Sequence, residues 1–70
     1  MIKVGQIYKP KNNKDYSFVV TKTEKMGDGC YVIWNDGSPN YHKISEEEIE
    51  LIAEYPTWQE AVNSKEFKGE

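Results

Sequence analysis

Side chains that could act as nucleophiles or metal ligands are scarce in this chain. One cysteine, Cys30, and one histidine, His42, are present among its 70 residues. Zinc sites combine several Cys and His ligands at close spacing, and a lone Cys–His pair is only a weak indication of a nucleophile with its base. We therefore predict that Cys30 is a small buried side chain and that His42 lies on an exposed or edge strand. The protein is predicted not to be an enzyme and to hold no metal or cofactor.

Carboxylates gather towards the C-terminal end. Residues 44–70 hold eight glutamates and two lysines, a net charge of −6, whereas residues 1–43 hold seven lysines and four acidic residues, a net charge of +3. The acidic run lacks the interleaved oxygen ligands and the glycine of a calcium-binding loop. We predict an acidic surface that helps to dock a basic protein partner, with these candidate residues: Glu46, Glu47, Glu50 and Glu54.

The N-terminal part combines lysines with tyrosines, as do proteins that bind single-stranded nucleic acid. Lys9, Lys11 and Lys14 lie close in the sequence to Tyr8 and Tyr16. Arginine, the usual residue for paired contacts to bases and phosphates, is absent, and the net charge of the chain is −3. A nucleic acid is therefore the second choice of partner, after a protein.

Length and composition predict one small domain over residues 1–70, with limited material for a core. A single cysteine allows no disulfide within the chain, which favours a reducing, intracellular location. No apolar run in the sequence reaches the length of a signal peptide or of a membrane span. We expect a cytoplasmic protein without a membrane partner, either monomeric or weakly dimeric.

Alternating apolar residues predict strands over 4–8, 16–23 and 30–34. Because Pro39 has no N–H, a strand over 38–44 must be short and lie at a sheet edge, or begin only at Asn40. Val19 breaks the alternation of the second strand, so part of its second face should be covered by a helix or by barrel closure. Residues 26–29 should reverse the chain, and Asp36-Gly37 should supply the two central residues of a hairpin turn, with Gly37 at positive φ.

The C-terminal third predicts two further elements. Ser45 and Glu48 have the spacing of a capping box, which predicts one helical turn leading into a short fifth strand, or alternatively one helix over 46–54. Thr57, followed three residues later by Glu60, predicts the start of a second helix that runs through about Lys65 and ends before Gly69. One stripe of that helix should pack on the sheet, made of these residues: Trp58, Ala61, Val62 and Lys65.

The pattern of strands and turns over residues 2–54 resembles small SH3-like barrels of the Tudor and KOW type. The similarity is carried by Val32-Ile-Trp-Asn-Asp-Gly37, a strand that ends in an aromatic residue and Asp-Gly, followed by a short strand and a helical turn. This resemblance implies a mainly β fold, a five-stranded antiparallel barrel with the helix over 57–66 packed on it. It also implies an aromatic cage for a cationic group, unless these residues only fill the core: Tyr8, Tyr16, Trp34 and Tyr41.

The ending Tyr55-Pro-Thr-Trp-Gln-Glu-Ala-Val62 is similar in style to the tails of small accessory proteins encoded by bacteriophages and prophages. This second resemblance implies a bacterial setting and a modulator of a host protein. Taken together, these features predict a small non-enzymatic module that binds a protein partly through its acidic C-terminal surface. The alternative is a KOW-like barrel that binds single-stranded nucleic acid through lysines and tyrosines of its N-terminal strands.

Overall fold

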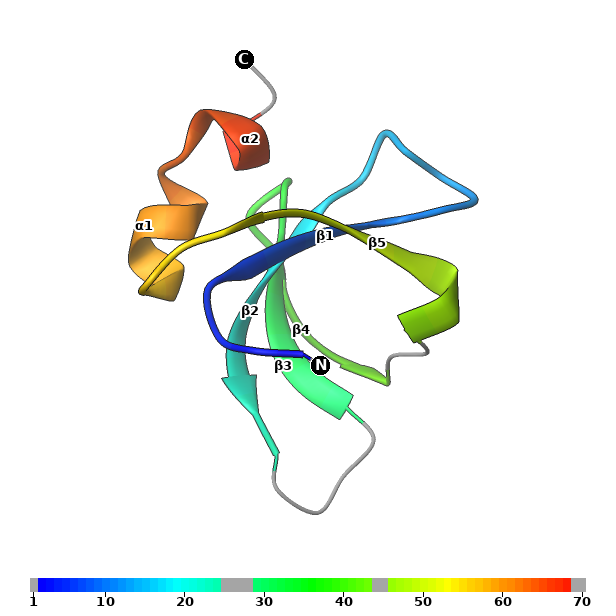
Figure 1. Cartoon of the computed structure of the whole chain (residues 1–70), viewed down its shortest axis with the longest axis horizontal. Helices are drawn as coiled ribbons and strands as arrows, with labels where there is room; N and C mark the ends of the chain where they lie inside the picture. The colour runs from blue at the N-terminus through cyan, green and yellow to red at the C-terminus, as the bar shows by residue number, and fades with distance from the viewer. Residues whose placement is uncertain (1, 25–28, 44–45, 69–70) are drawn as a thin grey trace.

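The computed structural model describes residues 2–24, 29–43 and 46–68 of the chain. Five antiparallel strands form one sheet in the order β4-β3-β2-β1-β5, so every pair of neighbours except β1 and β5 is also consecutive in sequence. Figure 1 shows the sheet with two short helices at one end. The predicted mainly β fold with five antiparallel strands is confirmed, whereas closure into a barrel is not, because β4 and β5 are the two edges of the sheet in the described residues. The elements are β1 (Gln6–Pro10), β2 (Phe18–Thr23), β3 (Gly29–Trp34), β4 (Pro39–Lys43), η1 (Glu46–Glu48), β5 (Ile49–Glu54), α1 (Trp58–Val62) and α2 (Lys65–Lys68).

The first strand begins later than the alternation predicts because of the conformation of Gly5. This glycine has φ of +92°, which is left-handed backbone, and β1 starts one residue after it. Its carbonyl accepts a hydrogen bond of 3.0 Å from the N–H of Tyr55, just after β5. A Cβ at Gly5 would overlap the Tyr55 carbonyl oxygen. Only glycine allows the chain to turn here and approach the end of β5 so closely.

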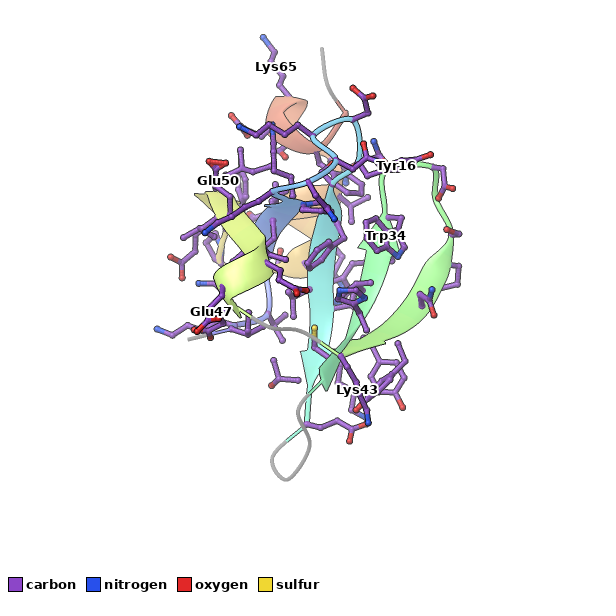
Figure 2. The ribbon with its side chains drawn as sticks, turned by 90° about the vertical axis from the view of Figure 1, so that its right-hand side faces the viewer. Tyr16, Trp34, Lys43, Glu47, Glu50 and Lys65 are labelled. Atoms are coloured by element: carbon purple, nitrogen blue, oxygen red, sulfur yellow. The ribbon has the colours of Figure 1, made fainter. Side chains whose placement is uncertain are left out.

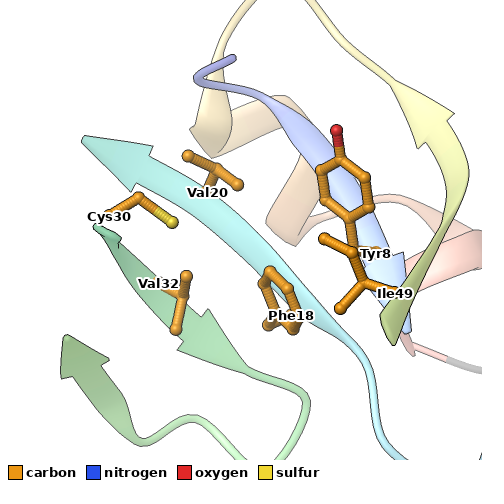
Figure 3. Packing of buried hydrophobic residues seen from close by; sticks show 6 residues of the cluster. All are labelled: Tyr8, Phe18, Val20, Cys30, Val32 and Ile49. Atoms are coloured by element: carbon orange, nitrogen blue, oxygen red, sulfur yellow. The ribbon is translucent and has the colours of Figure 1, made fainter. Parts of the chain in front are cut away.

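Both faces of the sheet are buried, as the broken alternation at Val19 predicts. One face holds a cluster around Phe18, and Figure 3 shows six of its members: Tyr8, Phe18, Val20, Cys30, Val32 and Ile49. The other face holds a second cluster of buried residues from the sheet and the two helices: Ile7, Val19, Ala61 and Phe67. A helix layer therefore covers the second face, which is one of the two solutions expected from sequence.

The segment over residues 46–54 follows the first of the two predicted alternatives. Residues Glu46–Glu48 form a single 3₁₀ turn, and a strand follows at once over Ile49–Glu54. The alternative of one helix over 46–54 is wrong, because Ile49–Glu54 is a strand that pairs with β1, and Ile49 also packs in the core. Ser45, the predicted cap of this turn, lies outside the described residues, as do residues 26–28 of the predicted chain reversal and Gly69.

The predicted C-terminal helix is two helices. The Thr57 hydroxyl oxygen accepts a hydrogen bond of 3.2 Å from the N–H of Glu60, so the predicted cap is confirmed. α1 ends at Val62, and α2 starts anew at Lys65 with the Ser64 hydroxyl oxygen accepting from the N–H of Phe67 at 3.3 Å.

The predicted single helix through Lys65 is wrong because polar side chains interrupt it. Asn63 and Ser64 bond to nearby backbone carbonyls, and such bonds compete with helix continuation. As a result Lys65 is exposed, and Phe67 completes the apolar contact in its place. No helix within these three described ranges has the length and apolar character needed to cross a membrane.

Candidate functional site

Two of the four aromatic residues predicted to form a cage meet in an open groove. The rings of Tyr16 and Trp34 lie edge to face, with centroids 6.4 Å apart and planes at 90°, and Figure 2 shows them as neighbours. The groove has a volume of about 460 Å³ and lies between the loop after β1 and the turn after β3. We call it the Tyr16–Trp34 groove; its other lining residues are Pro10, Asn12, Asn13, Asp36, Ser38 and Asn40.

Core packing holds the Trp34 ring in place from behind. Trp34 is opposite Phe18 in the β2–β3 ladder, and their ring centroids lie 5.1 Å apart. His42, on the edge strand β4 as predicted, also packs on both rings, at 5.5 Å from Phe18 and 5.8 Å from Trp34. The indole is therefore anchored on the core while part of it faces the groove.

The two loops that form the groove are joined by Asn35. Its backbone N–H donates to the Ser17 carbonyl at 2.9 Å, and its side-chain amide donates to the Asp15 carbonyl at 3.1 Å. These bonds tie the turn after β3 to the residues that flank Tyr16. Tyr16 itself remains 48% exposed, so its ring is available to a ligand.

The turn after β3 differs in one detail from the prediction. The Gly37 N–H donates to the Trp34 carbonyl at 2.8 Å, so the central residues of the turn are Asn35 and Asp36 and not Asp36 and Gly37. Gly37 does have positive φ, +91°, as predicted. The loop is thus a three-residue hairpin with a left-handed glycine in its last position. That glycine lets β3 and β4 keep their right-handed twist, whereas a type I turn alone would splay the two strands.

Asp36 places a negative charge at the rim of the groove. Its Oδ1 accepts bonds from the Ser38 hydroxyl at 2.6 Å and from the Ser38 N–H at 2.9 Å. These bonds, the one from the hydroxyl first, hold the pKa of the Asp36 carboxyl below its usual value. The carboxylate therefore stays ionised at neutral pH.

The other two predicted cage residues lie elsewhere, so a cage of four aromatics is wrong. Tyr8 is buried, stacks on Phe18 with centroids 5.8 Å apart, and donates its hydroxyl to Gln6 Oε1 at 2.7 Å. Tyr41 is opposite Tyr31 in the β3–β4 ladder and packs on it at 5.1 Å. Because Tyr31 lies next to Val32 in a strand, it points to the face away from the Trp34 side.

The predicted acidic residues lie on η1 and β5, and all are exposed: Glu46, Glu47, Glu50 and Glu54. In Figure 2, Glu47 and Glu50 lie on the opposite side of the view from Tyr16 and Trp34. Burial raises the pKa of the Tyr8 hydroxyl, and the charges of Glu46 and Glu54 raise it further. The acidic segment is therefore separate from the groove.

Sequence reasoning missed Asp36 as a site residue, along with the asparagines of the groove. The turn motif that contains Asp36 was visible, but only the hairpin geometry turns its carboxylate towards Ser38 and the groove rim. Cys30 is buried, as predicted, and burial raises the pKa of its thiol to about 11. Within the described part of the chain, no group of three or more Cys, His, Asp or Glu side chains is placed to hold a metal ion.

Comparison with models of protein families, with curated proteins and with solved structures found no match to this chain.

Proposed function

We propose that the protein is a small, non-enzymatic interaction module that binds a basic segment of a partner protein. The observation that carries this proposal is the Tyr16–Trp34 groove, which combines two aromatic rings with the ionised carboxylate of Asp36. A lysine or arginine side chain of the partner would lie against the rings and near the carboxylate. Aromatic faces attract cations within about 6 Å of the ring centroid, by roughly 0.5–1 kcal/mol at exposed sites.

The acidic surface of η1 and β5 would act at longer range. Glu46, Glu47, Glu50 and Glu54 are each exposed on two consecutive elements, and an excess of charge of one sign steers partners of opposite charge. Steering raises the association rate more than it adds binding energy, so its effect should weaken as salt rises. The groove would then provide the specific contact and the acidic surface the attraction.

The proposal includes an SH3-like fold in a bacterial, cytoplasmic setting, as in accessory proteins of phages and prophages. The strand order β4-β3-β2-β1-β5 and the single 3₁₀ turn before β5 support the SH3-like part. The phage-like part is supported by the style of the C-terminal sequence alone.

A titration that follows the two tryptophans separately tests the groove. A short lysine-containing peptide is added to ¹⁵N-labelled protein, and the indole N–H signals of Trp34 and Trp58 are followed by NMR. We expect the Trp34 signal to shift while Trp58 does not, since only Trp34 lines this groove. Asp36→Asn keeps an acceptor for Ser38 but removes the charge, and should weaken binding by about fivefold, equivalent to about 1 kcal/mol.

Two results would refute the proposed site: an unchanged Trp34 signal at millimolar peptide, or equal binding by wild type and Tyr16→Ala. The acidic surface is tested by reversing Glu47 and Glu50 to lysine, both of which are exposed. That variant should slow association with the peptide at low salt and remain folded by circular dichroism, with some loss of stability because Glu50 is opposite Lys9 in the β1–β5 ladder. An unchanged association rate would remove the acidic surface from the proposal.

Single-stranded nucleic acid is the second candidate because lysines gather on the other side of Tyr16. A cavity of about 150 Å³ beside its ring is lined by two lysines, Lys9 and Lys14, but also by two carboxylates, Asp15 and Glu66, which weaken its attraction for phosphates. Tyr8, however, is buried and cannot stack on a base. Binding of an oligonucleotide at micromolar affinity in physiological salt, with a steep salt dependence, would favour this candidate over the protein partner.

A further inference from the structure

The face of the sheet opposite the Tyr16–Trp34 groove carries a second set of exposed aromatic and cationic side chains. Tyr31 is 41% exposed and Tyr41 38% exposed, and the two are partners in the β3–β4 ladder. Lys22 is opposite Tyr31 in the β2–β3 ladder, and Lys43 lies two residues beyond Tyr41 and so shares its face. We call these four residues, Lys22, Tyr31, Tyr41 and Lys43, the tyrosine face.

An apolar groove of about 360 Å³ lies beside the tyrosine face. Its lining includes Tyr31 and Ile33 of β3, Pro39 of β4 and Trp58 of α1, so it lies between these elements. Almost all of its lining is carbon, unlike the mixed lining of the Tyr16–Trp34 groove. An apolar side chain placed here would lose water on most of its surface, and burial of a methylene group is worth about 0.8 kcal/mol.

The tyrosine rings are held in position before any partner binds. The Tyr41 ring lies over Gly29: a Cβ at Gly29 would come within 2.8 Å of the Tyr41 ring and 2.7 Å of the His42 carbonyl oxygen. The Tyr31 and Tyr41 rings pack on each other with centroids 5.1 Å apart. Aromatic side chains that are fixed in advance lose little entropy on binding, which makes them effective anchors at interfaces.

A partner cannot readily dock here by adding a strand to the edge of β4. The Trp34 N–H donates to the Ser38 carbonyl at 3.0 Å. Hydrogen-bonded and non-hydrogen-bonded pairs alternate along an antiparallel hairpin, so the N–H of Tyr41, three residues after Ser38, points away from β3. That N–H is taken by the side-chain oxygen of Asn40 at 2.8 Å, and Pro39 has no N–H at all. Both features protect sheet edges from strand pairing, so recognition on this side must use side chains.

Charge identifies the kind of segment that fits. The Lys22 Nζ lies 5.8 Å from the centre of the Tyr31 ring. Lys43 stands at the end of β4 (Figure 2), and the register of β4 places it on the face of Tyr41. No carboxylate is among the residues that line the apolar groove in the described parts of the chain. We propose that the tyrosine face and its groove form a second docking surface, for a segment of a partner protein in which an apolar side chain is flanked by acidic residues.

Nucleic acid fits this face less well than an acidic protein segment. The Tyr31 and Tyr41 ring planes meet at 69°, so they do not form a flat platform for successive bases. Lys22 already lies over the Tyr31 ring. The carbon-lined groove suits an aliphatic or aromatic side chain and offers few partners for the polar edge of a base.

The test uses a short synthetic peptide in which a Leu-Phe pair is flanked by glutamates. It is titrated into ¹⁵N-labelled protein, and we expect the indole N–H of Trp58 to shift while that of Trp34 stays unchanged. A peptide with Ser-Ser in place of Leu-Phe should not bind. Reversing both cations, Lys22→Glu with Lys43→Glu, should weaken binding by about tenfold or more.

The matched control for that variant is Lys11→Glu with Lys65→Glu, which changes the net charge equally at exposed positions outside this face. It should bind the acidic peptide nearly as wild type does, and circular dichroism should show both variants folded. Three outcomes overturn the proposal: no shift of Trp58 at millimolar peptide, equal loss of binding in the two variants, or stronger binding of oligothymidine than of the peptide at Trp58. This proposal and the proposed function can fail independently, because the acidic peptide is followed at Trp58 and the lysine-containing peptide at Trp34.

Discussion

Two glycines with nearly the same backbone conformation allow a close test of the fold. Gly5 has φ of +92° and Gly37 has φ of +91°, so both positions lie in the range of φ that alanine rarely adopts. Around Gly37 no heavy atom lies within 4 Å of an added Cβ. At Gly5 an added Cβ would overlap the Tyr55 carbonyl oxygen and lie 3.2 Å from the Tyr55 carbonyl carbon and 3.4 Å from that of Thr57. The difference between the two variants therefore isolates the close approach at Gly5.

The expected magnitudes follow from these contacts. An L-residue in left-handed backbone costs roughly 1–2 kcal/mol, which is the whole effect expected for Gly37→Ala. Gly5→Ala adds overpacking of roughly 1–3 kcal/mol and loses the bond from the Tyr55 N–H to the Gly5 carbonyl, worth about 1 kcal/mol. We expect Gly5→Ala to cost about 3–6 kcal/mol. A domain of this size has a total stability of roughly 4–10 kcal/mol, so this variant should be largely unfolded or close to it.

Urea unfolding followed by tryptophan fluorescence and circular dichroism measures both values. Gly37→Asn serves as a further control, because asparagine tolerates left-handed backbone and should lose less stability than Gly37→Ala. Equal loss of stability in Gly5→Ala and Gly37→Ala would refute the close approach between Gly5 and Tyr55. The position of β5 and α1 relative to β1 would then have to be revised.

Three further predictions concern the helices and the buried thiol. Trp58→Ala should lower the free energy of unfolding by about 3 kcal/mol, since large aromatic truncations cost about 3–5 kcal/mol and Trp58 is only partly buried; an unchanged urea midpoint would contradict its packing role. Because burial raises the pKa of Cys30 to about 11 in the folded state, the unfolded state loses this proton first, so stability should fall as pH rises from about 9 to 11. Cys30→Ala should show a shallower fall over that range, and identical pH slopes would contradict the shift. The Tyr55 hydroxyl bonds to the Glu66 carboxylate and lowers its pKa, so NMR titration should find the Glu66 pKa below its usual value in wild type and raised towards it in Tyr55→Phe.

Local rules in the sequence were sufficient for most elements of the fold. Alternation located the strands and their faces, including the second buried face signalled by Val19, although β1 begins at Gln6 and not at Val4. Thr57 with Glu60 placed the start of α1, and Pro39 indicated that β4 lies at an edge. These predictions succeeded because capping, proline sterics and the two-residue period of a strand act between residues that are close in sequence.

The candidate sites depended on contacts between distant residues, which only the tertiary structure decided. Four aromatics with similar local settings were candidates for one cage, yet Tyr8 is in the core, Tyr41 is on the opposite face, and only Tyr16 and Trp34 meet. The strand pattern alone tells on which face of the sheet a side chain lies, but it does not tell which loops come together in space. That depends on register and bulges, as at Val20/Lys22 in the β2–β3 ladder. For the same reason the need for glycine at position 5 was invisible in the sequence: the atoms that exclude a side chain there belong to Tyr55 and Thr57, about fifty residues away in the chain.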